Sequence, residues 1–424
     1  MLIKNGRIID PAQALDGVFD VRIRNGVIES IGEQLVPDEG EEVLDATNCC
    51  VCPGFIDMHV HFREPGFPEK ETIATGAAAA VAGGFTAVAC MPNTKPAIDS
   101  CQTIAHIQAL ATGAGLAHVY PVAAITKGRA GVELVDYPAL AQAGAVGFSD
   151  DGNTVMNARV LRDAALAASG TAGCFISHCE DEHIKGDAVM HLGATSEKLG
   201  VAGSPAIAED IIVSRDLQIA AETGKAWHIA HLSTQGAFEH MEAARARGVN
   251  ATCEVTPHHL LLIDEGVAEL GARGKVNPPL RQGDDAKALR DAVRAGKIDV
   301  FATDHAPHTA AEKSGDLQHA AVGFTGLEVA MGAYALALAD LPLDRFVELL
   351  STNPARILGV PGGDLKIGSP GDVTIFAEQK WTVDSTKFYS KGKATPFDGM
   401  ALPRRAVATV VGGKLVMHEG RVNI

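Results

Sequence analysis

The sequence is short of basic side chains: 36 lysines and arginines stand against 52 aspartates and glutamates, which gives a formal charge of −16. Nucleic acids and anionic membranes bind basic surfaces, so we predict that neither is a partner. No run of about 18 uncharged apolar residues is present, and the first residues do not resemble a secretory signal. We therefore expect a soluble, cytoplasmic protein.

Matched cysteine pairs are lacking as well. None of the eight cysteines forms a CxxC pair that a second pair matches, which predicts free thiols in a reducing compartment. The one cluster, Cys49-Cys50-Val51-Cys52, is better explained by small apolar side chains in a strand than by a metal site. Aromatic residues make up only 5% and hydrophobic residues 46%, with many alanines and glycines, which is typical of tightly packed α/β proteins.

Both ends of the chain are rich in short β-branched segments separated by turns. Asn5-Gly6 and Asn25-Gly26 are dipeptides typical of hairpin turns. Residues 371–376 and 407–417, near the other end, are likewise rich in β-branched residues next to glycine turns. We predict that residues 1–52 and 363–424 together form a small β-sandwich module beside a catalytic domain at residues 53–362.

The middle of the chain alternates strand-like and helix-like segments. Eight candidate strands end in polar residues: 55–62, 86–92, 118–126, 144–149, 173–178, 226–232, 249–256 and 298–304. Alanine-rich segments such as 72–82, 159–169, 206–222 and 284–295 favour helices between them. Eight such units predict an α/β fold with a closed (β/α)8 TIM-like barrel, in which functional groups lie at the carboxyl ends of the strands.

The first barrel strand ends in two histidines, His59 and His61. Side chains two residues apart on a strand point to the same face, so both imidazoles converge on one point. A lone histidine in such a strand is usually a hydrogen-bonded core residue, but two on one face favour a metal site. Arg63 follows them and offers a fixed positive group at the same strand end.

Four further ligand-type residues close other strands: Asp151, His178, His231 and Asp304. Four imidazoles and two carboxylates at one barrel mouth suit a pair of divalent ions, with zinc the leading candidate. Such a pair favours hydrolysis, in which one carboxylate bridges the metals and the other moves protons. Each residue alone would more often be structural, and only the set of six favours a metal centre.

Several polar residues near these strand ends are not expected to be metal ligands. His228 and His231 lie three apart and cannot both face the barrel axis, so we expect His228 to pack or to support a ligand. Asp150 and Asp151 point to opposite faces, and only one of them can be a ligand. His258 and His259 follow Pro257 in an expected loop, where surface exposure is the simpler interpretation.

Seven motifs together resemble the bacterial type I dihydroorotases of the amidohydrolase superfamily, over nearly the whole chain. They are HVHFREPG at 59–66, MPNT at 91–94, GFSDDG at 147–152, SHCED at 177–181, TPHH at 256–259, KVNPPLR at 275–281 and ATDHAPH at 302–308. Related hydantoinases, dihydropyrimidinases and allantoinases carry a bridging carboxylated lysine after the fourth strand. The segment here has no lysine, so the resemblance implies that Asp151 is the bridge.

The resemblance also implies a role for each site residue. His59, His61 and Asp304 would bind one Zn²⁺, His178 and His231 would bind a second, and Asp304 would be the catalytic acid and base. Substrate would be held by His61, Arg63, Asn93, Asn277, His308 and the backbone of Val322 and Gly323. One departure concerns the last pair: the family typically reads Ala-Pro-Phe-Gly, whereas residues 320–323 read Ala-Ala-Val-Gly.

The implied reaction is the reversible cyclisation of N-carbamoyl-L-aspartate to L-dihydroorotate in pyrimidine synthesis. Two alternatives remain open from the sequence: a related cyclic amidohydrolase acting on hydantoin, dihydropyrimidine or allantoin, and a non-catalytic partner of aspartate transcarbamoylase. The absence of that lysine and the presence of Arg63 and Asn93, a pair suited to a carboxylate, argue against the first alternative. The complete ligand set argues against the second. The superfamily implies a homodimer. A complete ligand set is also compatible with association with aspartate transcarbamoylase.

Overall fold

Eight parallel strands in the middle of the chain close into a barrel in the computed structural model, which describes residues 1–423. They are β6 (Phe55–Val60), β7 (Phe85–Cys90), β8 (His118–Pro121), β9 (Gly147–Phe148), β10 (Cys174–Ser177), β13 (Trp227–Ile229), β14 (Ala251–Val255) and β15 (Val300–Phe301). The strands pair as β6-β7-β8 and as β9-β10-β13-β14-β15. Single parallel bridges from Ala123 to Phe148 and from Val60 to His305 join the two sheets and complete the ring. All eight predicted strands are confirmed.

Two apolar clusters separate the inside of the barrel from its outside. One cluster contains Ile56 of β6 and Ile176 of β10, which lie on opposite sides of the ring, so it fills the interior. Leu358 belongs to the same cluster and comes from α14 (Asn353–Leu358). A larger cluster packs the outer faces of the strands against the surrounding helices. The interior is therefore a packed core, as barrel strands of this kind require.

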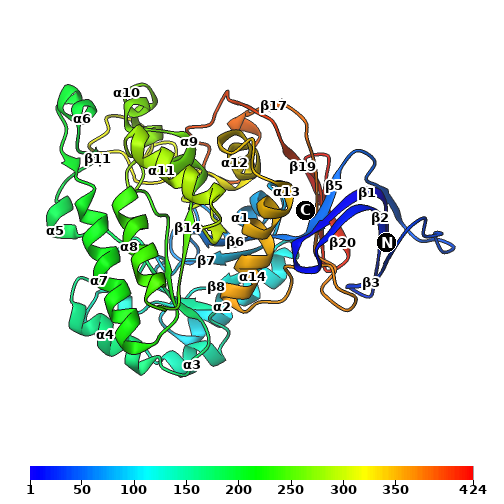
Figure 1. Cartoon of the computed structure of the whole chain (residues 1–424), viewed down its shortest axis with the longest axis horizontal. Helices are drawn as coiled ribbons and strands as arrows, with labels where there is room; N and C mark the ends of the chain where they lie inside the picture. Colours follow the sequence, from blue (N-terminus) through cyan, green and yellow to red (C-terminus); the bar gives the residue numbers. More distant parts are fainter. Residues whose placement is uncertain (424) are drawn as a thin grey trace.

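Helices cover the outside of the barrel (Figure 1). The longer ones are α1 (Ile73–Ala82), α2 (Cys101–Ala114), α4 (Ala158–Ala167), α7 (Ile207–Thr223), α8 (Gln235–Ala246), α11 (Gly283–Arg294) and α12 (Ala330–Ala337). Short ones are α3 (Tyr137–Gln142), α5 (Glu182–Lys185), α6 (Ala194–Leu199), α9 (Pro257–Leu261), α10 (Val267–Leu270) and α13 (Leu343–Val347). The four predicted helical segments are confirmed to within about two residues. None of the helices in residues 1–423 has both the length and the apolar character needed to span a membrane.

Helix starts follow from capping side chains. The hydroxyl of Thr72 accepts a hydrogen bond from the backbone N–H of Thr75, and Thr234 does the same for Ala237. Each hydroxyl accepts a hydrogen bond from an N–H group in the first turn of its helix that would otherwise have no partner. The cap therefore fixes where the chain leaves the barrel mouth and turns back along the outside.

Both chain ends contribute to one nine-stranded sheet, and Figure 1 shows the two termini close to it. Its strands are β1 (Leu2–Asp10), β2 (Leu15–Arg24), β3 (Val27–Gly32), β4 (Val43–Asp45), β5 (Cys50–Pro53), β16 (Val373–Ala377), β19 (Arg405–Val411), β20 (Lys414–His418) and β21 (Arg421–Val422). β5 pairs with β1 in parallel and with β16 in the antiparallel sense, so the two ends of the chain join there. Ile8 of β1 and Val410 of β19 share one buried cluster, because the sheet folds over its own core. Two small sheets, β11 (Met190–His191) with β12 (Gly203–Ser204) and β17 (Trp381–Thr382) with β18 (Ala401–Leu402), lie elsewhere.

One of the two predicted hairpin turns is correct and the other is wrong. Asn25-Gly26 connects β2 to β3, and both residues have positive φ angles, of 53° and 81°. Asn5-Gly6 lies inside β1, where the register with β2 shifts, as in a β-bulge. Asn5 adopts a φ of 64° there, a left-handed conformation like that of Asn25, but the chain continues in the same direction.

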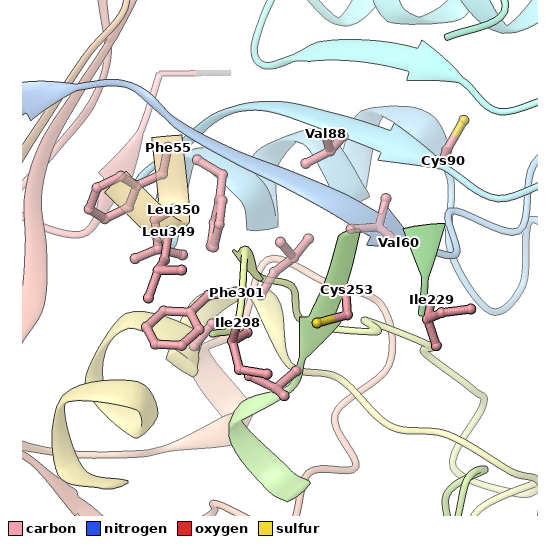
Figure 2. Close-up of a cluster of buried hydrophobic side chains, with 14 of the residues drawn as sticks. Phe55, Val60, Val88, Cys90, Ile229, Cys253, Ile298, Phe301, Leu349 and Leu350 are labelled. Carbon is pink, nitrogen blue, oxygen red and sulfur yellow. The ribbon is translucent and has the colours of Figure 1, made fainter. Parts of the chain in front are cut away.

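A cluster of buried apolar side chains ties the first barrel strand to the rest of the molecule (Figure 2). Figure 2 shows Phe55 of β6 and Phe301 of β15 in this cluster. The ring of Phe55 lies 6.1 Å from Phe85, 6.4 Å from Phe346 and 6.2 Å from Phe376 of β16, measured between ring centroids. The strand that ends in His59 and His61 is therefore anchored in the barrel and in the end sheet at once.

Candidate metal centre and pocket

The six side chains predicted as metal ligands meet at the mouth of the barrel formed by the carboxyl ends of the strands. His59 and His61 come from the end of β6, Asp151 follows β9, His178 follows β10, His231 follows β13, and Asp304 follows β15. All six are buried, with at most 7% of each residue exposed. The structure brings together every residue of the predicted set.

Asp151 lies between the four imidazoles. Its Oδ1 is 3.4 Å from His59 Nε2, and its Oδ2 is 3.4 Å from His61 Nε2. On the other side, Oδ1 is 3.6 Å from His178 Nδ1 and 3.7 Å from His231 Nε2. The carboxylate thus belongs to two groups of three candidate ligands, one with each pair of histidines.

The spacing and chemistry of these atoms fit two divalent metal ions. Ligand atoms about 2.0–2.1 Å from a tetrahedral zinc lie roughly 3.3 Å from one another, close to the separations around Asp151. His59 Nε2 and Asp151 Oδ1 are buried without a hydrogen-bond partner among residues 1–423. Unpaired buried polar atoms are unfavourable, and a cation would satisfy both. Imidazole nitrogen and carboxylate oxygen are ligands that zinc accepts.

Asp304 lies on the β6 side of this centre. Its Oδ1 is 3.0 Å from His61 Nε2 and 3.6 Å from His59 Nε2. Burial opposes ionisation of the carboxyl group, but the hydrogen bond with His61 and the nearby imidazoles outweigh burial and lower its pKa. An ionised carboxylate at this position can take part in metal binding or accept a proton from a group in the pocket.

Two buried carboxylates behind the histidines were missed by the sequence analysis. Glu254 of β14 is 2.6 Å from His59 Nδ1 and 3.1 Å from His228 Nε2. Glu180 is 3.0 Å from His178 Nε2. Burial opposes ionisation of both carboxyl groups, but the adjacent imidazoles, and Lys185 beside Glu180, lower each pKa to about 2. A carboxylate on the outer nitrogen of a histidine fixes the ring and its tautomer for metal binding.

Asn93 has a similar position behind His61. Its Oδ1 lies 2.8 Å from His61 Nδ1, so that nitrogen donates and Nε2 is left facing the centre. Three of the four imidazoles therefore have an oxygen on the outer nitrogen, namely His59, His61 and His178. Asn93 also lines the pocket in front of the centre, where it was expected to hold substrate.

A pocket of about 250 Å³ opens in front of the centre. It is lined by His61, Arg63, Asn93, Asp151, Gly152, His178, His231, Val276, Asn277, Asp304, Ala306, His308, Val322 and Gly323. Every residue predicted to bind substrate is in this set, although no bound molecule tests the individual roles. His59 lies behind the pocket and is completely buried.

Arg63 presents a cation to this pocket. Its Nε donates to the backbone oxygen of Pro307 over 3.2 Å, and no carboxylate within residues 1–423 forms a salt bridge with it. Burial lowers the pKa of the guanidinium to about 10, which leaves it charged at neutral pH. His308 Nε2 donates to the backbone oxygen of Val322 over 2.8 Å and so links the two sides of the pocket. Arg63 Nη2 also lies 3.3 Å from His308 Nε2. A buried guanidinium without a carboxylate partner is suited to a ligand carboxylate, which its planar fork can bind with two hydrogen bonds.

The backbone at Gly323 packs too closely for a side chain. A Cβ atom there would lie 2.6 Å from Ala306 Cβ, and the φ angle is 104°. The N–H of Gly323 donates to the oxygen of Lys275 over 3.0 Å. Glycine is therefore required at this position of the pocket wall, whereas the preceding Val322 is 36% exposed.

Other polar residues singled out in the sequence do not join the centre. Asp150 accepts hydrogen bonds from the N–H groups of Ile125 and Thr126, which leaves Asp151 as the ligand-type residue of the pair. His228 supports the site through Glu254, as expected. The surface position expected for His258 and His259 is wrong: both are buried in α9, and neither lines the pocket.

Comparisons with known proteins place these observations in a family. A family model described as Dihydro-orotase-like matches residues 49–237. A protein named dihydroorotase from Anaeromyxobacter dehalogenans strain 2CP-C is 45% identical over 428 residues, covering 100% of this chain and 99% of its own. Another dihydroorotase, from Pelotomaculum thermopropionicum, is 46% identical over 424 residues and covers 99% of each chain.

Solved structures agree on the fold. An L-hydantoinase (dihydropyrimidinase) from Arthrobacter aurescens superimposes with a TM-score of 0.88 at 24% identity, covering 100% of this chain and 97% of its own. A D-hydantoinase (dihydropyrimidinase) from a Thermus species gives a TM-score of 0.82 at 26% identity, with coverage of 100% and 96%.

Proposed function

The chain belongs to the dihydroorotase family, and we propose that it is a type I dihydroorotase. The proposed reaction is the reversible cyclisation of N-carbamoyl-L-aspartate to L-dihydroorotate with loss of water, a step of de novo pyrimidine synthesis. One observation carries this proposal: the buried Arg63, which has no carboxylate partner within residues 1–423, lines the same small pocket as the histidine and aspartate side chains. The pocket therefore offers a carboxylate site next to a site suited to cyclic-amide hydrolysis.

In this proposal the six strand-end residues hold two zinc ions. His59, His61 and Asp304 would bind one ion, His178 and His231 would bind the other, and Asp151 would bridge them. Two divalent ions at such a site lower the pKa of water and polarise a carbonyl oxygen. The unpaired buried atoms of His59 and Asp151 support this assignment.

Asp304 is the proposed general acid and base. In the hydrolytic direction its carboxylate takes a proton from the attacking water and gives that proton to the ring nitrogen as the amide bond breaks. Ring closure uses the same group in reverse. The role requires an ionised carboxylate at neutral pH, and the lowered pKa of Asp304 supports it.

Arg63 is the proposed anchor of the substrate carboxylate. Its planar guanidinium can bind both carboxylate oxygens, and the low exposure of the pocket strengthens such a charged contact. Asn93, Asn277 and His308 would contact the ring and its substituents, with the backbone of Val322 and Gly323 closing one wall. Asn93 would then serve both the substrate and His61, to which it is already bonded.

A hydantoinase-like activity is the second candidate, and the likeness to solved hydantoinases favours it. That class is expected to carry a bridging carboxylated lysine. Residues 147–152 read Gly-Phe-Ser-Asp-Asp-Gly and provide the Asp151 carboxylate instead. Arg63 also has no obvious partner on an unsubstituted hydantoin, which lacks a carboxylate.

We further propose that residues 53–362 form the catalytic domain and that residues 1–52 and 363–424 form the accompanying module. The pairing of β5 with β16 supports this division. We expect a homodimer in the cytoplasm, where the eight free cysteines would stay reduced. Light scattering on the purified protein, alone and mixed with an aspartate transcarbamoylase, measures the oligomeric state and tests for association.

Turnover of L-dihydroorotate, hydantoin and allantoin, compared on zinc-loaded and chelator-stripped protein, tests the proposed function. Zinc-dependent turnover of L-dihydroorotate alone is the expected result. A preference for hydantoin or allantoin would overturn the substrate assignment and leave the metal centre in place. Absence of turnover on all three would leave a non-catalytic role as the better explanation.

A further inference from the structure

A short helix brings a lysine back to the metal centre. α5 begins directly after Asp181, whose carboxylate accepts hydrogen bonds from the N–H groups of His183 and Ile184 over 2.9 and 3.0 Å. Gly186 ends the helix with a φ of 53°. This single turn folds the side chain of Lys185 back toward Glu180, and Lys185 Nζ lies 2.5 Å from Glu180 Oε2.

The same oxygen of Glu180 faces His178, a proposed metal ligand. His178 Nε2 lies 3.0 Å from Glu180 Oε2. Glu180 is 1% exposed, so its charge would be unfavourable in the interior without a cation. Lys185 is that cation: its side chain is 17% exposed, and its ammonium ion is in contact with the carboxylate.

Lys185 also contacts Asn277, one of the residues that line the pocket. The Asn277 amide is oriented with its oxygen toward Lys185. In this orientation Lys185 Nζ donates to the Asn277 side-chain oxygen, and the Asn277 side-chain nitrogen donates to the backbone oxygen of Val276 over 3.0 Å. An amide nitrogen carries two hydrogens, so one N–H remains for the pocket that Asn277 lines. With its oxygen turned toward Lys185, the Asn277 amide has this remaining N–H as the group to offer a bound molecule.

We propose that Lys185 is a positioning residue, which holds the Asn277 amide as a hydrogen-bond donor toward an oxygen of the substrate while Glu180 anchors its ammonium ion. The inference rests on the proposed function, because it takes Asn277 as a substrate contact. It follows that the group opposite Asn277 is a carbonyl or carboxylate oxygen, and not a ring N–H. The contacts His178–Glu180–Lys185–Asn277 then connect one proposed zinc ligand to the substrate side of the pocket.

Replacing Lys185 with Met tests this role, because Met keeps the length of the chain and removes the ammonium ion. Without Lys185 the Asn277 amide could turn over, and in some of the protein molecules its oxygen would then face the substrate oxygen. We expect KM for L-dihydroorotate to rise about tenfold, with kcat at saturating zinc changed less than about threefold. Lys185→Arg, which keeps a donor to both partners, should restore most of KM. Lys198→Met, on the exposed face of α6, is the matched control and should leave KM unchanged.

A double-mutant cycle with Asn277→Ala decides whether Lys185 acts through Asn277. If it does, the effects of Lys185→Met and Asn277→Ala on KM should not add, and the double variant should resemble Asn277→Ala alone. Additive effects, or an unchanged KM in Lys185→Met, would overturn the proposal. A fall in thermal stability with kcat and KM equally affected, and not rescued by Arg, would reduce Lys185 to a structural role and also overturn it.

The wild-type protein separates this inference from the proposed function. If wild type turns over L-dihydroorotate but the Lys185→Met variant keeps its KM, only the role of Lys185 fails. If wild type prefers hydantoin, the proposed substrate fails, and the same cycle measured on hydantoin decides the role of Lys185. If wild type turns over neither L-dihydroorotate nor hydantoin, competition for zinc with a chelator tests the connection from Lys185 to His178. Equal zinc retention in wild type and Lys185→Met would overturn that connection.

Discussion

Glu254 and His59 form a 2.6 Å contact between side chains that lie 195 positions apart in the chain. His59 Nδ1 is thereby held on a carboxylate of β14, and Nε2 points toward Asp151. The pair joins two strands of the barrel, so the orientation of a proposed metal ligand depends on correct closure of the ring. Glu254 therefore tests the orientation of His59 without removing any of the six predicted ligands.

Replacing Glu254 with Gln should weaken zinc binding by about 10-fold to 100-fold, because the charge that orients His59 and His228 is lost while the shape is kept. Competition with a chromogenic chelator measures the change. Glu239→Gln, at an exposed position of α8, is the control. Equal zinc affinity in the two variants would mean that Glu254 only fills space.

Replacing Asp304 with Asn should lower kcat by about 10²-fold to 10⁴-fold, because an amide cannot shuttle the proton. The thermal unfolding midpoint should stay near the wild-type value, since the residue is at the barrel mouth and not in its packed core. Zinc content must be measured in parallel, because Asp304 is also a proposed ligand. Near-normal turnover with both ions bound would remove Asp304 from the proton-transfer role.

Replacing Arg63 with Lys should raise KM for both L-dihydroorotate and N-carbamoyl-L-aspartate by about tenfold or more, because a point charge replaces a two-pronged contact. kcat should change less. Arg159→Lys, whose side chain is 88% exposed on α4, should behave as wild type. An unchanged KM for Arg63→Lys would place the substrate carboxylate elsewhere in the pocket.

Glu328 should make the stability of the protein depend on pH. Burial raises the pKa of its carboxyl group from 4.5 to about 8, despite hydrogen bonds from the N–H groups of Tyr389 and Ser390. Between these two values the folded protein holds a proton that the unfolded chain releases, so this group makes stability fall as pH rises from about 5 to 8. The slope has an upper bound of about 1.4 kcal/mol per pH unit.

Thermal unfolding of wild type and Glu328→Gln between pH 5 and pH 8 measures this contribution. Gln keeps an oxygen for both N–H groups but has no proton to release. Relative to the variant, wild type should therefore lose stability as pH rises. A constant difference between the two proteins across this range would show that Glu328 does not titrate there.

The strand-end residues could be found from the sequence because the barrel geometry itself places them. His59 and His61 are two residues apart on a strand, and the other four predicted ligands each follow an apolar run that ends in polar residues. Parallel strands bring their carboxyl ends to one mouth, so no knowledge of long-range contacts was needed. Arg63 shares this logic, whereas Asn277 and His308 came from family motifs alone.

The supporting residues could not be found in the same way. Glu254 is one charged residue in an apolar strand, which was a visible signal, but its partners His59 and His228 are set by which strands are neighbours. Asn5-Gly6 has the composition of a hairpin turn, and only the continued pairing of β1 with β2 turns it into a bulge. His258 sits in a helix that buries it, which no local pattern indicates.

The pairing of β5 with β16 has a consequence for how the enzyme matures during translation. β5 leads directly into the strand that carries His59 and His61, and Phe55 packs against Phe376. β16 begins at Val373, so it leaves the ribosome long after the barrel strands have been made. Until then one edge of β5 is unpaired and Phe55 lacks part of its cover. We therefore expect the first barrel strand to be fully anchored only at the end of synthesis, and a prematurely terminated chain would possess every proposed ligand without that anchor.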